Sequence, residues 1–152
     1  MDSLRTCLWF DDCAEAAAEF YVSLIPGSAI EARIGGGPGR KPFMMLFHLA
    51  GVPYQAMNGG PSHVLSPAVS ISVTTEDQAE TDALWAAVIA DGGEEGRCGW
   101  CVDRFGLSWQ IVPRALPATV GGADPEGAAR ATKAMMAMNK IDIAALEAAY
   151  RG

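Results

Sequence analysis

Two glutamines stand in the middle of segments that predict β-strands, where a polar side chain needs a reason. Gln110 lies between Trp109 and Ile111 in "SWQIV", and Gln55 lies in the similar segment "YQAM". An amide donates and accepts hydrogen bonds, and its carbonyl oxygen can act as a neutral metal ligand. A mid-strand glutamine therefore either faces solvent or lines a polar site, and the elements around it decide between the two.

Five further side chains carry chemistry but give weaker predictions. Cys98 and Cys101 have the C-x-x-C spacing of redox motifs, but such motifs normally open a helix, whereas this pair enters a predicted strand. His48 lies in the apolar segment "MLFHLAG" and His63 in a loop, so we interpret each as a structural or exposed histidine rather than a base. Asn58 precedes two glycines and is interpreted as a turn residue or as a ligand contact at a cavity mouth.

Alternation along the predicted strands separates a side that faces the helices from an opposite side. The side chains predicted to face the helices are Cys7, Trp9, Val69, Ile71, Val73, Leu107, Trp109 and Ile111. The opposite side mixes apolar and polar groups. A flat sheet would leave such a side in solvent, whereas a strongly curved sheet would make it a ligand pocket. The predicted pocket residues are Thr6, Leu8, Phe10, Gln55, Met57, Ala68, Ser70, Ser108 and Gln110.

The chain repeats one order of predicted elements, strand–helix–strand–strand–strand. The first module covers about residues 3–61 and the second about residues 66–114, and a helical tail follows over about residues 124–150. We therefore predict one α+β domain over residues 1–152. It comprises two βαβββ modules, whose curved mixed sheets form a cavity, and C-terminal helices.

Capping signals mark where the helices begin, because an oxygen-bearing side chain can accept from the free N–H groups of a first turn. The predicted N-caps with their capping-box partners are Asp12 with Glu15 and Thr75 with Gln78. Asp124 and Pro125 begin the tail, and a second short helix is expected after Asp142. The segment between Pro117 and the tail is expected to be a linker.

Composition and charge exclude several classes of partner. The chain has 152 residues, a net charge of −7 and a hydrophobic fraction of 50%, which is typical of a globular domain. Its negative charge disfavours nucleic acid and anionic membranes as partners. No apolar run approaches a membrane span, and the N-terminus lacks the apolar core of a signal peptide. We expect a cytoplasmic protein with reduced cysteines.

Several longer segments resemble one branch of a known superfamily. The segments "CLWFDDCAEAAAEFYVSLIPGS", "MNGGP", "EEGRCGWCVDRFGLSWQIVP" and "MNKIDIAALEAAY" are similar to PhnB-like members of the glyoxalase/bleomycin-resistance (vicinal oxygen chelate) superfamily. The resemblance implies paired βαβββ modules that curl around a cavity, commonly in a homodimer. Such members are often labelled 3-demethylubiquinone-9 3-methyltransferase-like. The glycine-rich run "IGGGPGR" joins predicted strands instead of opening a helix, so it does not predict a methyl-donor loop.

Metal enzymes of this superfamily carry ligands at four strand positions, which by resemblance fall here at Thr6, Gln55, Ala68 and Gln110. Alanine offers no ligand, threonine is a poor one, and the two glutamines are neutral, whereas divalent metals prefer carboxylates or imidazoles. We expect neither a metal nor another cofactor. A register slip of one residue in "YQAMN" would place Tyr54 where Gln55 is predicted.

The function implied by the resemblance has two forms. One is a metal-independent enzyme that acts on a small oxygenated substrate, and the other is a protein that sequesters a ligand without turnover, as bleomycin-resistance proteins do. The sequence names no substrate. We also expect a homodimer, because the tail is rich in alanine and methionine and offers more apolar surface than a small domain needs. Met135, Met136 and Met138 are predicted to pack on the body or on a partner subunit.

Overall fold

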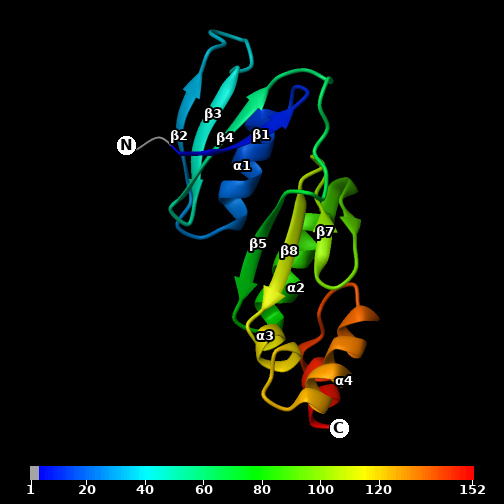
Figure 1. Ribbon diagram of the computed structural model, residues 1–152. Helices are drawn as coiled ribbons and strands as arrows, with labels where there is room; N and C mark the ends of the chain where they lie inside the picture. Colours follow the sequence, from blue (N-terminus) through cyan, green and yellow to red (C-terminus); the bar gives the residue numbers. More distant parts are fainter. Residues whose placement is uncertain (1–3) are drawn as a thin grey trace. The chain divides into compact units, whose positions relative to one another are not determined.

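The computed structural model describes residues 4–152 of the chain. These residues divide into two compact units, one ending at Leu65 and the other running from Ser66 to Gly152. Each unit holds one sheet with a helix on one face (Figure 1). The predicted α+β class and the repeated βαβββ order are confirmed, although each sheet is open rather than closed on itself.

The first unit is built from one helix and four strands. Its elements are β1 (Thr6–Phe10), α1 (Ala14–Leu24), β2 (Ala29–Ile34), β3 (Met44–Leu49) and β4 (Val52–Asn58). The strand order is β1-β4-β3-β2, with β1 parallel to β4 and the other pairs antiparallel. The core lies between α1 and the sheet and includes Leu8, Phe10, Tyr21, Met45, Phe47 and Ala56.

The second unit repeats this topology. Its elements are β5 (Ser70–Thr75), α2 (Gln78–Ile89), the short 3-10 turn η1 (Ala90–Gly92), β6 (Glu94–Glu95), β7 (Trp100–Val102) and β8 (Ser108–Pro113). The strand order is β5-β8-β7-β6, and β5 runs parallel to β8. The sequence does not locate β6, because two glutamates carry no strand propensity and only their pairing with β7 makes them a strand.

The buried carboxylate of Asp103 fixes the turn between β7 and β8. Asp103 is 3% exposed. Its Oδ1 accepts hydrogen bonds from the backbone N–H groups of Phe105 (2.8 Å) and Leu107 (3.1 Å), and its Oδ2 accepts one from the indole N–H of Trp109 (2.8 Å). This contact holds Leu107 and Trp109 on the helix side of β8. Because side chains alternate along a strand, Gln110 must then point to the other side.

The C-terminal tail contains three helices. They are α3 (Ala115–Val120), α4 (Pro125–Met136) and α5 (Ile143–Arg151), so the predicted linker after Pro117 is wrong in part, because Pro117 lies inside α3. A proline is tolerated in a first helical turn, where its missing N–H is not needed. A small core of Ala131, Ile141 and Leu146 holds the helices together. Within residues 4–152, no helix is long and apolar enough to cross a membrane.

The methionines of the tail take different positions. Met135 and Met138 pack against the tail's own core. Met136 is 56% exposed, and its sulfur lies 3.6 Å from Sγ of Cys98. The tail is also joined to the loop before β7, because the N–H groups of Cys98 and Gly99 donate to the carbonyls of Met138 (2.9 Å) and Asn139 (2.8 Å).

Helix α1 is capped from a distant strand. Oδ1 of Asn58, the last residue of β4, accepts from the N–H of Ala14 at 2.8 Å, and its Nδ2 donates to the carbonyl of Pro42 at 2.8 Å. The predicted cap at Asp12 is therefore wrong. Asp12 instead pairs with Lys41 at 2.6 Å, which raises the pKa of that lysine.

Helix α2 begins two residues later than predicted. Asp77 is its N-cap, and Oδ1 of Asp77 accepts from the N–H of Glu80 at 2.9 Å. Thr75, the predicted cap, is buried at the end of β5 and hydrogen bonds to Thr81 at 2.7 Å. The carboxylate of Glu80, at the third helical position, accepts from the N–H of Glu76, the residue before the N-cap, at 2.7 Å. The side chain of Gln78 therefore does not cap α2, and it hydrogen bonds to the C-terminal tail instead.

Candidate functional site

Gln110 lies in the middle of the second sheet on the face opposite α2, here called the open face. In register it stands beside Ser72 of β5 and Trp100 of β7. Its Nε2 donates a hydrogen bond of 2.8 Å to Oγ of Ser70. The side chain is half-buried. The contact with Ser70 restricts the orientation of the amide.

Gln55 takes the corresponding place in the first sheet. It stands in register beside Cys7 of β1 and Leu46 of β3, on the face opposite α1. Its neighbour Tyr54 points the other way and stacks on Phe47, with 5.6 Å between the ring centroids. Burial raises the pKa of Tyr54. The one-residue slip that would exchange Gln55 for Tyr54 does not occur.

The faces predicted for β1 are reversed. Leu8 and Phe10 are 1% and 3% exposed and lie in the core, so they do not belong to the open face. Trp9 lies on the open side instead, with its indole N–H donating to the carbonyl of Gly60 at 2.8 Å. The reason is physical, because an indole N–H needs an acceptor, which the loop offers and an apolar core does not. Thr6 pairs with Tyr54 in register, away from Gln55.

The other four predicted pocket residues lie in different environments. The prediction that Ala68 is a strand residue of the pocket is wrong, because Ala68 is exposed in the turn before β5. Met57 is half-buried and pairs in register with Trp9 and Met44, so it lies on the open face of the first sheet. Ser108 pairs in register with Ser70, so both lie on the open face by strand parity, but Ser108 is only 2% exposed. Ser70 itself hydrogen bonds to Gln110.

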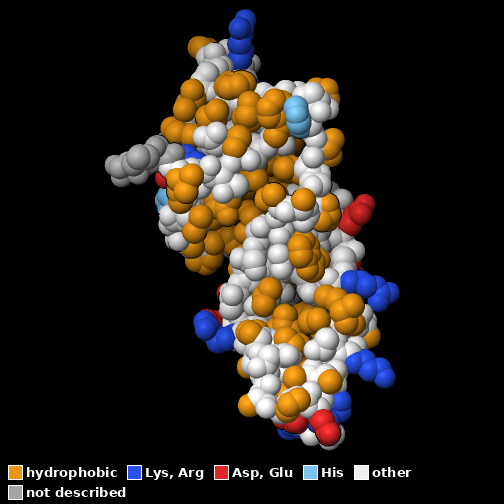
Figure 2. Space-filling view, viewed as in Figure 1, with side chains coloured by type: hydrophobic (Ala, Val, Ile, Leu, Met, Phe, Trp, Pro, Cys, Tyr) orange, Lys and Arg blue, Asp and Glu red, His pale blue; other side chains and the backbone are white. Residues whose placement is uncertain are grey.

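The open face of the second sheet is uncharged over three of its strands. By strand parity its side chains are Ser70, Ser72, Thr74, Trp100, Val102, Ser108, Gln110 and Val112. None of these ionises. In Figure 2, the surface over β5 and β8 is mostly neither charged nor hydrophobic, whereas hydrophobic side chains gather over the strands of the first unit. Trp100 was not among the predicted pocket residues, because a three-residue strand is too short for its alternation to assign a face.

The two histidines lie in surroundings that do not make them catalytic bases. Nδ1 of His48 is buried on β3 and has no hydrogen-bond partner among the described residues, 4–152, and His48 pairs in register with Pro53. His63 lies in the loop after β4, with its ring centroid 4.8 Å from that of Trp9. Its Nδ1 lies 3.0 Å from Oγ of Ser62. Among residues 4–152, neither histidine is hydrogen-bonded to a carboxylate that would orient it as a base, and the contact of His63 is with the exposed side chain of the preceding residue.

The residues around the two glutamines do not fit a divalent metal. The register neighbours of Gln55 and Gln110 supply one thiol and one hydroxyl, from Cys7 and Ser72. Among residues 4–152, no group of three or more His, Cys, Asp or Glu side chains could hold a metal ion. A metal site needs several good donors in tetrahedral or octahedral order. A protein without bound metal stays our prediction.

The C-x-x-C pair lies in a loop and a strand, and not at the start of a helix where redox motifs of this spacing normally lie. Cys101 is 1% exposed on β7, while Cys98 lies half-buried in the preceding loop with a φ of +59°, and all four cysteines are free thiols. Burial, with smaller contributions from Asp103 and Glu95, raises the pKa of Cys101 to about 12. A thiol with this pKa stays protonated at neutral pH and is a poor nucleophile.

We predict that the cysteines differ sharply in reactivity. In the folded protein at neutral pH, an alkylating reagent should modify the exposed Cys7 first and leave Cys101 unmodified, which mass spectrometry of peptides would measure. In denaturant without reductant, all four thiols should react. Equal labelling rates for Cys7 and Cys101 in the folded protein would contradict the buried position of Cys101.

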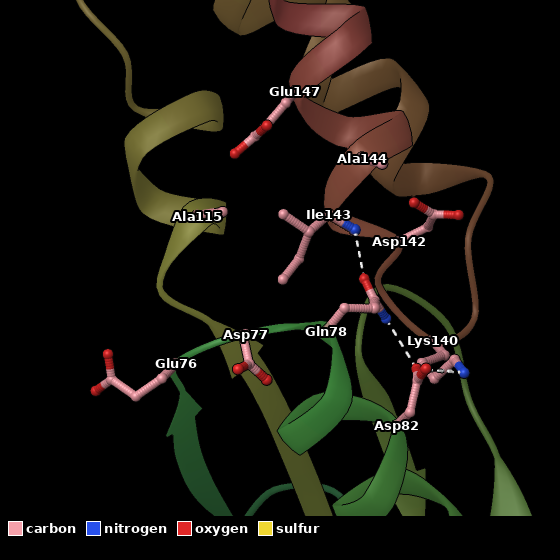
Figure 3. A pocket seen from close by; sticks show the side chains of 10 residues that line it. All are labelled: Glu76, Asp77, Gln78, Asp82, Ala115, Lys140, Asp142, Ile143, Ala144 and Glu147. Atoms are coloured by element: carbon pink, nitrogen blue, oxygen red, sulfur yellow. Dashed lines mark hydrogen bonds and ion pairs between the residues drawn. The ribbon is translucent and has the colours of Figure 1, made fainter.

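A cavity of about 510 Å³ lies where the tail meets the start of α2. Its lining residues are Glu76, Asp77, Gln78, Asp82, Ala115, Lys140, Asp142, Ile143, Ala144 and Glu147 (Figure 3). None of the predicted pocket residues lines it. A smaller cavity of about 220 Å³ lies beside the start of α1 and includes Asp12, Cys13 and Lys41.

The polar groups of the larger cavity fasten the tail to α2. Oε1 of Gln78 accepts from the N–H of Ile143 at 2.8 Å, and its Nε2 donates to the carbonyl of Ile141 at 3.1 Å and to Asp82 at 2.8 Å. Figure 3 shows this amide between α5 and Asp82. Lys140 lies 2.5 Å from Asp82 and lowers the pKa of that carboxyl. Asp77 and Asp142 cap helices. The polar groups of this cavity therefore attach the tail to α2.

Comparisons with known proteins agree with this architecture. The model of the 3-demethylubiquinone-9 3-methyltransferase family matches residues 2–112, which leaves the tail outside the match. The PhnB protein from Bacillus cereus is 29% identical, with 74% of this chain and 99% of that chain covered and a TM-score of 0.63. A Pseudomonas aeruginosa protein is 20% identical, with 73% and 98% covered and a TM-score of 0.59.

A more distant structure extends the likeness of fold. A glyoxalase/bleomycin resistance protein from Albidiferax ferrireducens is 15% identical, with 75% of this chain and 99% of that chain covered and a TM-score of 0.50. At this identity the match concerns the fold alone. No curated protein sequence matches the chain.

Proposed function

The chain belongs to the 3-demethylubiquinone-9 3-methyltransferase family and has the glyoxalase/bleomycin-resistance fold, and on that premise we propose that it binds a small molecule at the open faces of its sheets. Gln55 and Gln110 are the proposed polar contacts. The glycine-rich segment 35–39 joins β2 to β3 and opens no helix, so methyl transfer is not part of the proposed function.

One observation carries this proposal. Each sheet has a glutamine on the face away from its helix, Gln55 on β4 and Gln110 on β8. Each glutamine lies beside a small polar side chain. That small neighbour is Cys7 in the first sheet and Ser72 in the second. A half-buried amide on a sheet face is a polar group available to a ligand, and each module has one on the face away from its helix.

The two forms of this function differ in turnover. A metal-independent enzyme would convert a small oxygenated substrate, and a sequestering protein would bind its ligand and release it unchanged. Binding is favoured over turnover because, within residues 4–152, the thiol of Cys7 and the hydroxyl of Ser72 beside the two amides are not hydrogen-bonded to a base that could activate them. We propose binding as the primary activity. The free cysteines fit a cytoplasmic location, which is part of the same proposal.

We expect the Gln110→Ala variant to bind the retained ligand about five-fold more weakly, because it removes one hydrogen bond worth about 1 kcal/mol. Native mass spectrometry of protein purified without a metal-chelating tag would first identify the ligand, and a titration would compare the two proteins. Thr132→Ala, on the exposed side of α4, is the matched control and should bind like the wild type. Wild-type protein with no retained ligand, and no affinity for candidate small molecules, would contradict the proposal.

We also propose a homodimer. Ile34 and Phe43 are apolar and 46% and 50% exposed, and they lie at the same end of the first sheet, where β2 ends and β3 begins. Neighbouring exposed apolar residues are typical of interaction sites. Sedimentation velocity should therefore give twice the chain mass at micromolar concentration. A single-chain mass that does not change with concentration would rule the dimer out.

A further inference from the structure

The open face of the second sheet contains a row of three side chains that crosses three neighbouring strands. Trp100, Gln110 and Ser72 stand directly beside one another on β7, β8 and β5. Neighbouring strands are about 4.8 Å apart, so the row spans roughly 10 Å, the length of a ring with one substituent. It offers in sequence an aromatic surface, an amide and a hydroxyl.

The chemistry of this row excludes charge. The open-face residues of β5, β7 and β8 carry hydroxyl, amide, indole or aliphatic groups, none of which ionises. Glu94 has the same parity but belongs to the edge strand β6, two strands away from Gln110. An ionic ligand placed over the row would lose water without gaining a counter-charge, which is costly. The net charge of −7 acts further against anions.

We propose that this face selects an uncharged ligand that lays a flat ring on Trp100 and directs a hydroxyl or carbonyl oxygen to Gln110. This inference rests on the proposed function and names the class of ligand. Trp100 is half-buried and supplies the apolar surface, because a tryptophan face packs well on a flat ring. Gln110, held by its 2.8 Å bond to Ser70, can donate or accept, so either oxygen group can be bound.

Three probes of similar size and different charge test this selection. Benzyl alcohol, benzoate and benzylammonium would be titrated into ¹⁵N-labelled protein, following the side-chain amide of Gln110 and the indole of Trp100. We expect Kd for benzyl alcohol to be at least about ten-fold lower than for either ion. Trp100→Ala should weaken benzyl alcohol binding about five-fold or more.

A charge introduced into the row should change the preference. Gln110→Glu should strengthen benzylammonium binding about ten-fold and weaken benzoate binding. Thr132→Glu adds the same charge on α4, away from the sheet, and should leave the order of the three probes unchanged. The amide spectrum of each variant reports whether it is folded.

The outcomes separate the inference from the function on which it rests. Equal affinity for the three probes, or shifts that bypass Gln110 and Trp100, would overturn the selection of neutral ligands. If native mass spectrometry still showed a retained small molecule, the proposed function would stand. If neither a retained molecule nor any probe bound, both would be overturned.

Discussion

Replacing Asp103 with alanine should lower the free energy of unfolding by about 3–5 kcal/mol, the largest effect we expect from one substitution. The carboxylate accepts from two backbone N–H groups and the indole of Trp109 while only 3% exposed. Alanine removes the acceptor of these three hydrogen bonds. Urea unfolding followed by tryptophan fluorescence and circular dichroism would measure the loss.

Two further variants make this prediction specific. Asp103→Asn keeps one acceptor oxygen and places an NH₂ group against donors, so it should lie between wild type and Asp103→Ala. Glu94→Ala removes an exposed carboxylate from the same sheet and should unfold near the wild-type urea concentration. A wild-type midpoint for Asp103→Ala would mean that the turn does not depend on the carboxylate. The orientation of Gln110 toward the open face would then need another explanation.

Asn58→Ala should destabilise the protein by about 2 kcal/mol. Its amide caps α1 through Ala14 and donates to the carbonyl of Pro42, each at 2.8 Å, and alanine leaves both backbone groups without this partner. Loss of a cap costs about 1 kcal/mol, and loss of a second hydrogen bond costs a similar amount. Thermal unfolding and urea unfolding of the variant would measure the change.

The matched controls distinguish the observed cap from the cap that the sequence suggests. Asp12→Ala removes only an exposed ion pair with Lys41 and should behave like the wild type. Asn58→Asp keeps the oxygen that caps α1 and loses only the bond to Pro42, so it should be destabilised less than Asn58→Ala. If Asp12→Ala proved the more damaging substitution, Asp12 would be the true cap.

Local patterns were sufficient for β8 and insufficient for β1. In β8 the large apolar side chains Trp109 and Ile111 alternate with polar ones, so only one face can be buried. In β1 every residue from Cys7 to Phe10 is apolar, and alternation cannot decide between the two faces. The decision comes from the partner strand and from the acceptor that the carbonyl of Gly60 offers to Trp9.

Long-range contacts explain the other differences. Asn58 caps a helix 44 residues before it in the chain, a distance at which no capping pattern can be recognised in a sequence. Similarly, Gln78 matches a local capping box, but its amide binds the tail 63 and 65 residues later. The sequence therefore predicts the two modules and the position of Gln110, while the residues that fasten one element to another follow only from the fold.

The attachment of the tail through Gln78 has a consequence for how the second unit opens. The tail has its own core in Ala131, Ile141 and Leu146, and it is hydrogen-bonded to α2 and to the loop before β7 without joining the sheet as a strand. Release of these few bonds would free α4 and α5 while β5 and β8 stay paired. Amide hydrogen exchange in α4 and α5 should then proceed by a low-energy opening, faster than exchange in β8, which requires the whole unit to unfold.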